Sequence, residues 1–135
     1  MERLPDWRVR LAEWLEEVRN QPFAQGRHDC ALFAAGAVRA VTGTDLAEVY
    51  RGRYRTTRGG LRILRKAGFD DHVALALHHF ARQPIALVRE GDLVVSDTDQ
   101  GPGFGVVQGA AAYVLGQNGL ALMALSQARL ALKVG

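Results

Sequence analysis

The sequence predicts an α+β protein in which helices come first and an antiparallel sheet follows. Up to about residue 80, apolar residues recur near helical spacing in segments that Gly or Pro interrupts. From about Leu87 onward, the pattern changes to short apolar runs separated by turn residues. The 135 residues, 48% hydrophobic and 23% charged, suit one globular domain over residues 1–135 with one core.

Two helices are expected before residue 45. The first covers about residues 6–19, with Asp6 as its N-cap and one apolar face. The second runs from Asp29 to about Thr42 and is rich in Ala and apolar nearly all round. We therefore expect this second helix to be buried at the centre of the protein, and Gly43 to end it.

Two further helices are expected before the sheet. After one helical turn at residues 46–50, a basic amphipathic helix is predicted from Thr57 or Arg58 to Ala67, and Gly68 ends it. Its inward residues are expected to be Leu61, Ile63 and Leu64. Asp70 or Asp71 caps the last helix, which continues through His79.

The second half of the chain predicts an antiparallel meander of short strands. A strand is expected at residues 91–95, and a loop at residues 98–103. Residues 117–119, Gln-Asn-Gly, form a predicted hairpin turn. The remaining strands are expected at residues 104–108, 111–115 and 120–125, with an edge strand at residues 130–134.

Composition excludes several classes of protein. No apolar run approaches the roughly 18 residues that a bilayer-spanning helix needs. The charged first residues lack the apolar stretch of a signal peptide, so we expect folding in a cytoplasm. A single cysteine, Cys30, excludes an intramolecular disulfide and a cysteine-based zinc site. The irregular spacing of His and Asp predicts no metal site, and no cofactor is expected.

Basic residues are concentrated in one segment although the net charge is only +3. Residues 51–66 contain seven basic residues and no acidic one. Such a segment is either a solvated helix face or a surface for nucleic acid, an anionic cell-wall polymer or an acidic protein. No nucleic-acid motif accompanies it, so no nucleic-acid partner is expected. The partner-binding candidates are Arg51, Arg53, Arg55, Arg58 and Arg62.

Cys30 is the candidate nucleophile because it lies in the first turn of the predicted buried helix. Free backbone N–H groups and the helix dipole there favour a thiolate and can hold an oxyanion. Asp29 is expected to cap the helix and so position Cys30. The alternative is that Cys30 is a buried side chain with only a packing role.

The motif around Cys30 resembles that of a known family. Residues 26–33 read Gly-x-x-Asp-Cys-x-x-Phe, residues 91–94 read Gly-Asp-Leu-Val, and residues 105–109 read Gly-Val-Val-Gln-Gly. In order and spacing, these motifs resemble the NlpC-type papain-fold cysteine peptidase superfamily. The Pro-Phe-x-x-Gly-x-x-Asp-Cys form that ends at Cys30, with residues 51–56 following, is most similar to a short branch among phage and prophage tail genes.

The resemblance implies a papain-like fold in which the Cys-bearing helix packs on the meander. It also implies a Cys nucleophile and a His base that cleave peptidoglycan stem peptides, but the position of that His holds Gly103. The favoured hypothesis is therefore a virion protein of the tail tip or hub, a catalytically degenerate pseudoenzyme that contacts other tail proteins. It would be made in the bacterial host cytoplasm and reside in the virion tail. The alternatives are an active cysteine peptidase or amidase that acts on peptidoglycan, and an acyltransferase-like variant.

Four histidines and two aspartates are further candidates for the base of Cys30. His28 lies two residues before Cys30, a spacing that favours packing or a loop hydrogen bond over catalysis. His72 follows a predicted helix cap and is expected in solvent, while His78 and His79 lie at a helix end, where the dipole favours a cation. The last candidates are two loop carboxylates, Asp97 and Asp99, which are expected at the mouth of the cleft.

Overall fold

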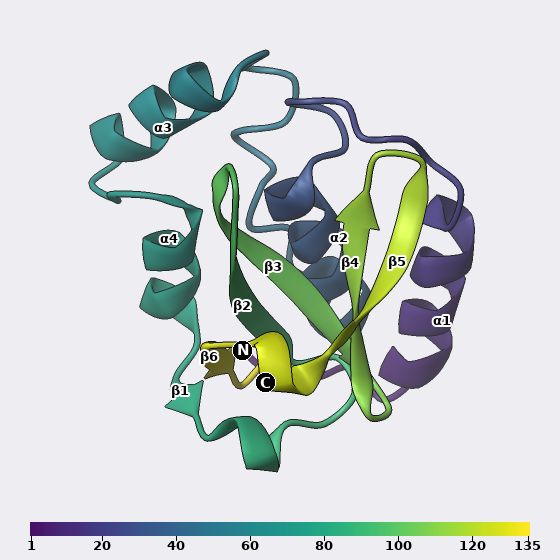
Figure 1. The fold of residues 1–135 in the computed structure, drawn as a ribbon. Coiled ribbons are helices and arrows are strands. Elements are labelled where there is room, and N and C mark those ends of the chain that lie inside the picture. The colour runs from purple at the N-terminus through teal and green to yellow at the C-terminus, as the bar shows by residue number, and fades with distance from the viewer.

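The computed structural model describes residues 1–135 and confirms an α+β fold of four helices and a six-stranded sheet (Figure 1). The helices are α1 (Trp7–Val18), α2 (Cys30–Thr42), α3 (Thr57–Lys66) and α4 (His72–His79). The strands are β1 (Arg82–Gln83), β2 (Leu93–Thr98), β3 (Gly101–Gln108), β4 (Ala111–Gly116), β5 (Gly119–Ala124) and β6 (Leu130–Leu132). Short 3-10 turns, η1 (Ile85–Leu87) and η2 (Leu125–Gln127), precede β2 and β6. None of the helices combines the length and the apolar composition needed to cross a membrane.

The sheet is antiparallel throughout and has the order β1-β6-β2-β3-β4-β5. Strands β2 to β5 form the predicted meander, and two residues connect β4 to β5. The prediction that residues 130–134 form an edge strand was wrong. Strand β6 pairs with β1 on one side and with β2 on the other, so the two-residue strand β1 is the edge. A strand this short carries no periodicity from which its pairing could be predicted.

The predicted loop at residues 98–103 was also wrong, because β2 and β3 form a tight hairpin there. Thr98 pairs with Gly101, so only Asp99 and Gln100 lie in the turn. The Thr98 hydroxyl donates to the Gly101 carbonyl at 2.6 Å, and Gly101 has a φ of +103°. This left-handed backbone and the side-chain hydrogen bond close the turn within two residues.

Side-chain caps begin three of the four helices. Asp29 accepts a hydrogen bond from the backbone N–H of Leu32, and Asp71 accepts one from Ala74. Thr56 caps α3 in the same way. Asp6 precedes α1 as predicted, but its side chain makes no capping hydrogen bond. The apolar face of α3 is only half-buried, since no residue of this helix is fully buried.

Apolar side chains fill both faces of the sheet. Alternate residues of a strand point to opposite faces. Val95 and Val106 therefore join the main cluster with the α2 residue Phe33, while Val94 and Val107 join a smaller cluster on the other face. Helix α4 contributes to the main cluster as well, so α2 and α4 cover the same face of the sheet (Figure 1).

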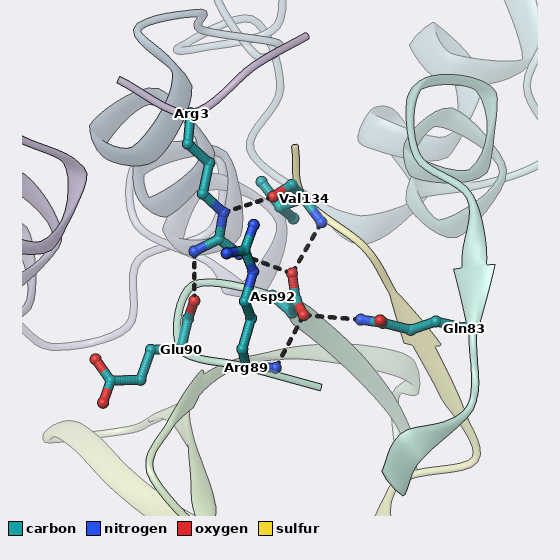
Figure 2. Close-up of polar contacts among 6 residues, drawn as sticks. All are labelled: Arg3, Gln83, Arg89, Glu90, Asp92 and Val134. Carbon is teal, nitrogen blue, oxygen red and sulfur yellow. Dashed lines mark hydrogen bonds and ion pairs between the residues drawn. The ribbon is translucent and has the colours of Figure 1, made fainter. Parts of the chain in front are cut away.

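The two chain ends meet at a buried ion pair between Arg3 and Asp92 (Figure 2). Their side chains are 6% and 1% exposed, and Arg3 Nη2 lies 2.9 Å from the carboxylate. The same carboxylate accepts hydrogen bonds from Gln83 Nε2 and from the backbone N–H groups of Arg89 and Val134 at 2.8–3.0 Å. One aspartate thus joins the N-terminal segment, β1, the start of β2 and the chain after β6.

Arg3 is held equally well on its other nitrogens. Its Nε donates to the Val134 carbonyl at 2.8 Å, and its Nη1 donates to the Glu90 carbonyl at 2.6 Å (Figure 2). A buried ion pair stabilises a fold only when hydrogen bonds satisfy the remaining polar atoms of both partners. Arg3 and Asp92 meet that condition.

Replacing Asp92 is expected to destabilise the protein strongly. Asp92→Ala leaves the Arg3 charge buried without its partner and removes the acceptor of three further hydrogen bonds. We expect a loss of about 3–5 kcal/mol in the free energy of unfolding, measured by urea denaturation. The control is Asp97→Ala, which breaks the exposed Asp97–Arg129 pair and should cost under about 1 kcal/mol. Equal losses in both variants would contradict this account.

Candidate functional site

Cys30 is half-buried and lines a groove of about 1080 Å³. The walls come from the start of α2, the segment from Tyr54 through α3 to α4, and the β2–β3 hairpin. The side chains that bear on the chemistry of the groove are Cys30, Tyr54, His72 and Phe104. The structure therefore places the predicted nucleophile in a concave site, where a ligand can reach it.

Burial raises the pKa of the Cys30 thiol, and the neighbouring Asp29 charge raises it further. Hydrogen bonding to the backbone of Phe104, Ala31 and Cys30 itself acts in the opposite direction but is outweighed. This direction is opposite to the one that the helix start alone predicts, because the helix dipole competes here with removal of the thiolate from water. Cys30 is accordingly held as a neutral thiol near pH 7.

Asp29 lies where the sequence predicts, as the N-cap of α2, and its carboxylate is fully used by the loop around it. Its Oδ1 accepts from the Leu32 N–H at 2.9 Å, and its Oδ2 accepts from the Gly26 N–H at 3.0 Å and from the Tyr54 hydroxyl. The residue is only 3% exposed. These contacts make Asp29 a positioning residue for Cys30.

Tyr54 is the residue of this site that the sequence analysis did not single out. It comes from the loop before α3, and its backbone carbonyl packs on Gly26, where an added Cβ would lie 1.9 Å from the Tyr54 oxygen. Its ring packs against Gly60 in α3, where an added Cβ would lie 3.1 Å from Cδ2. Burial and the bond to Asp29 raise the pKa of Tyr54, so its hydroxyl remains a donor. The sequence signal that could have identified Tyr54 is its position in residues 51–56, the segment that takes part in the family resemblance.

His28 is buried and packs against the core rather than entering the groove. It is 2% exposed, and its ring lies edge-on to Phe33 with 6.3 Å between ring centres. Burial lowers the pKa of His28, so the ring is neutral at pH 7. Its Nε2 has no hydrogen-bond partner in the protein. The geometry agrees with a packing role, the alternative that the sequence favours.

Strand β3 directs the side chain at position 104, and not position 103, to the side of the sheet that α2 covers. Phe104 belongs to the main core cluster with the α2 residues, so position 103 faces the opposite side of the sheet. A Cβ built on Gly103 would contact Thr98 Cγ2 at 3.2 Å, on that opposite side. The position where the family resemblance implies a base therefore holds no side chain and faces away from α2.

His72 is closer to this part of the site than the sequence predicts. As the first residue of α4, it extends to β3, where its Nε2 lies 2.7 Å from the Pro102 carbonyl. Its ring meets Phe104 edge-on, with 5.2 Å between ring centres. A carbonyl only accepts, so Nε2 carries a proton, and in the neutral form of the ring the lone pair is on the other nitrogen, Nδ1. Cys30 and His72 thus approach Phe104 from the same face of the sheet.

None of the remaining candidate bases is among the groups that act on the Cys30 thiol, although Asp97 and Asp99 line the same groove. His78 and His79 are at the end of α4, where His78 meets Phe69 edge-on at 5.4 Å. Asp97 forms an exposed ion pair with Arg129 at 2.8 Å, and Asp99 lies exposed in the β2–β3 turn. No three His, Cys, Asp or Glu side chains are grouped so that they could hold a metal ion.

One of the five partner-binding candidates, Arg51, is already paired. Its guanidinium is bound to both carboxylate oxygens of Asp45 at 3.1 Å, and its side chain is 34% exposed. The sequence did not predict this pair, because Asp45 lies outside the basic segment and reaches it only through the turn at residues 46–52. The other four candidates are exposed and form no ion pair: Arg53, Arg55, Arg58 and Arg62.

Tyr54→Phe should loosen the loop that holds Cys30, because it removes a donor from the buried Asp29 carboxylate. We expect a loss of about 1.5–3 kcal/mol in the free energy of unfolding and faster alkylation of Cys30. The control is Tyr50→Phe, since the Tyr50 ring also lines the groove but its hydroxyl makes no hydrogen bond within the protein. A Tyr54→Phe protein that matches the control in both measurements would show that the bond has no positioning role.

Comparisons with known proteins place the chain in one family. A family model described as a domain of unknown function, DUF6950, matches residues 2–134. The search of curated proteins found no significant match. Since the family model covers nearly the whole chain, including the Cys30 loop, the groove and both termini, the protein belongs to the DUF6950 family.

Proposed function

We propose that the protein is a component of a phage or prophage tail tip or hub, built on an NlpC-type papain-like scaffold that serves as a docking module. In this proposal the scaffold is catalytically degenerate. It contacts other tail proteins through its surface and its groove rather than cleaving peptidoglycan. The motifs around Cys30, at the start of β2 and in the second half of β3 are the basis for the scaffold assignment.

The observation that carries the proposal is the state of the Cys30 thiol. A cysteine nucleophile needs a thiolate, which a lowered pKa or an adjacent base supplies. Burial raises the pKa of Cys30 instead, and position 103 on β3 is a glycine that faces away from α2. Asp29 does not act on the thiol as a base either, because its carboxylate accepts hydrogen bonds from the Gly26 and Leu32 N–H groups. These features support a scaffold that keeps its fold but lacks the activated thiolate needed for peptide hydrolysis.

The second candidate function is a cysteine peptidase or amidase, and His72 is the observation that favours it. In this function His72, whose Nε2 is bound to the Pro102 carbonyl, would use Nδ1 to take the Cys30 proton and return it to a leaving amine. The thiolate would add to an amide carbonyl, and backbone N–H groups at the start of α2 would hold the oxyanion; the C–N bond would then break, releasing the protonated amine and leaving a thioester on Cys30. Water would then hydrolyse the thioester and release the acid.

The ionisation of Cys30 separates the two functions. We expect the alkylation rate of the folded protein to reach half its maximum at a higher pH than that of the denatured protein, because burial raises the thiol pKa. The reference thiol pKa is about 8.5. The measurement is the rate of iodoacetamide labelling against pH, and the single cysteine gives one signal. A folded-state pKa below that of the denatured chain would support the peptidase instead.

Association with tail proteins and hydrolysis of peptidoglycan test the proposal directly. We expect the protein to copurify with hub components of its phage, and Cys30→Ser to remain in the assembly. We expect no release of peptides from purified peptidoglycan. Hydrolysis that disappears in both Cys30→Ser and His72→Gln, but persists in His78→Gln, would overturn the proposal and establish the second function with His72 as its base.

A further inference from the structure

The charge of the protein is strongly segregated. Residues 51–66 carry seven of the 17 basic residues, so the rest of the chain has ten basic residues against 14 acidic ones. The protein is therefore net acidic outside this segment although it is net basic as a whole. A segment of this kind attracts an anionic partner to one place on the surface.

Most of these charges are unneutralised. Arg51 is paired with Asp45, but the other six side chains are exposed and take part in none of the ion pairs of the protein. We call these six the basic surface: Arg53, Arg55, Arg58, Arg62, Arg65 and Lys66. Five of the six are arginines, whose planar fork binds a carboxylate or a phosphate through two parallel hydrogen bonds.

The basic surface continues into the groove that contains Cys30. Arg58, Arg62 and Arg65 follow one another at helical spacing along α3, and Arg65 also lines the groove. Leu61 and Leu64, on the groove side of the same helix, are only half-buried. Figure 1 shows α3 at the outer side of the molecule, away from the sheet. Helix α3 therefore offers both cations and apolar side chains to one ligand.

The rest of the groove decides which anion fits. Hydrophobic residues make up 22 of its 41 lining residues, so a ligand with apolar groups gains more from it than a purely polar one does. The groove is also lined by two exposed, unpaired carboxylates, Asp70 just after α3 and Asp99 in the β2–β3 turn, while Asp97, which lines it too, is paired with Arg129. A uniformly charged polyanion that entered the groove would be repelled there.

We infer that the basic surface and the groove bind an acidic polypeptide segment of a partner protein, one that combines carboxylate side chains with apolar ones. The carboxylates lie on the basic surface, and the apolar side chains enter the groove between α3 and the β2–β3 hairpin. This inference rests on the proposed role as a docking module and names the chemistry of the partner. Because Cys30 lines the same groove, the bound segment also covers its thiol.

The test uses a fluorescently labelled synthetic peptide with a glutamate-rich half and a half of alternating leucine and serine. We expect saturable binding by anisotropy, weakening as salt is added, and slower alkylation of Cys30 in the bound state. Arg58→Gln/Arg62→Gln should weaken binding about tenfold, the effect of losing two exposed ion pairs. The control Arg82→Gln/Lys133→Gln removes the same charge from exposed positions elsewhere and should bind like the wild type.

Three results would overturn the inference: no saturable binding, equal weakening by both double variants, or tighter binding of single-stranded DNA than of the peptide. A peptide with serine in place of leucine should bind with lower affinity. Equal affinity of the two peptides would show that the groove is not part of the binding site. Peptide binding and copurification with tail proteins are separate measurements. Copurification without peptide binding would overturn this inference alone, and peptide binding without copurification would overturn the tail assignment alone.

Discussion

The buried pair of Arg3 and Asp92 holds together segments that no other side chain joins. Its hydrogen bonds connect the first residues, the edge strand β1, the start of β2 and the last residues of the chain. The groove depends on this connection indirectly, because β2 and β3 form one of its walls and β2 begins next to Asp92. The aspartate of the Gly-Asp-Leu-Val motif is thus a structural centre and lies outside the groove.

A second aspartate organises the site itself. Asp29 caps α2, holds the Gly26 backbone and accepts from Tyr54, which in turn packs on α3. The loop of Cys30 and the basic helix are therefore parts of one packed unit, even though α3 buries no residue completely. Helix α3, the proposed docking surface, and the environment of the thiol are therefore physically linked through Tyr54.

Local sequence signals predicted most of the fold and part of the site. The helix caps at Asp29 and Asp71, the buried α2 and the β4–β5 turn all follow from residues close together in the chain. The position of β6 between β1 and β2 and the tight Thr98–Gly101 turn were not predicted, because they depend on long-range pairing and on a single side-chain bond. Three features of the site were not predicted either, because they arise from tertiary packing: the Arg51–Asp45 pair, the approach of His72 to Phe104 and the raised pKa of Cys30.

The interior position of β6 also sets an order of events during synthesis. Strand β1 contacts the rest of the sheet only through β6, and Asp92 acquires its Val134 partner only when the last residues are present. The meander β2–β5 can pair earlier, since its strands are consecutive and joined by short turns. On the ribosome, the chain therefore exposes the outer edge of β2 until β6 has been synthesised. A truncated product would keep that unpaired edge, which is a template for aggregation.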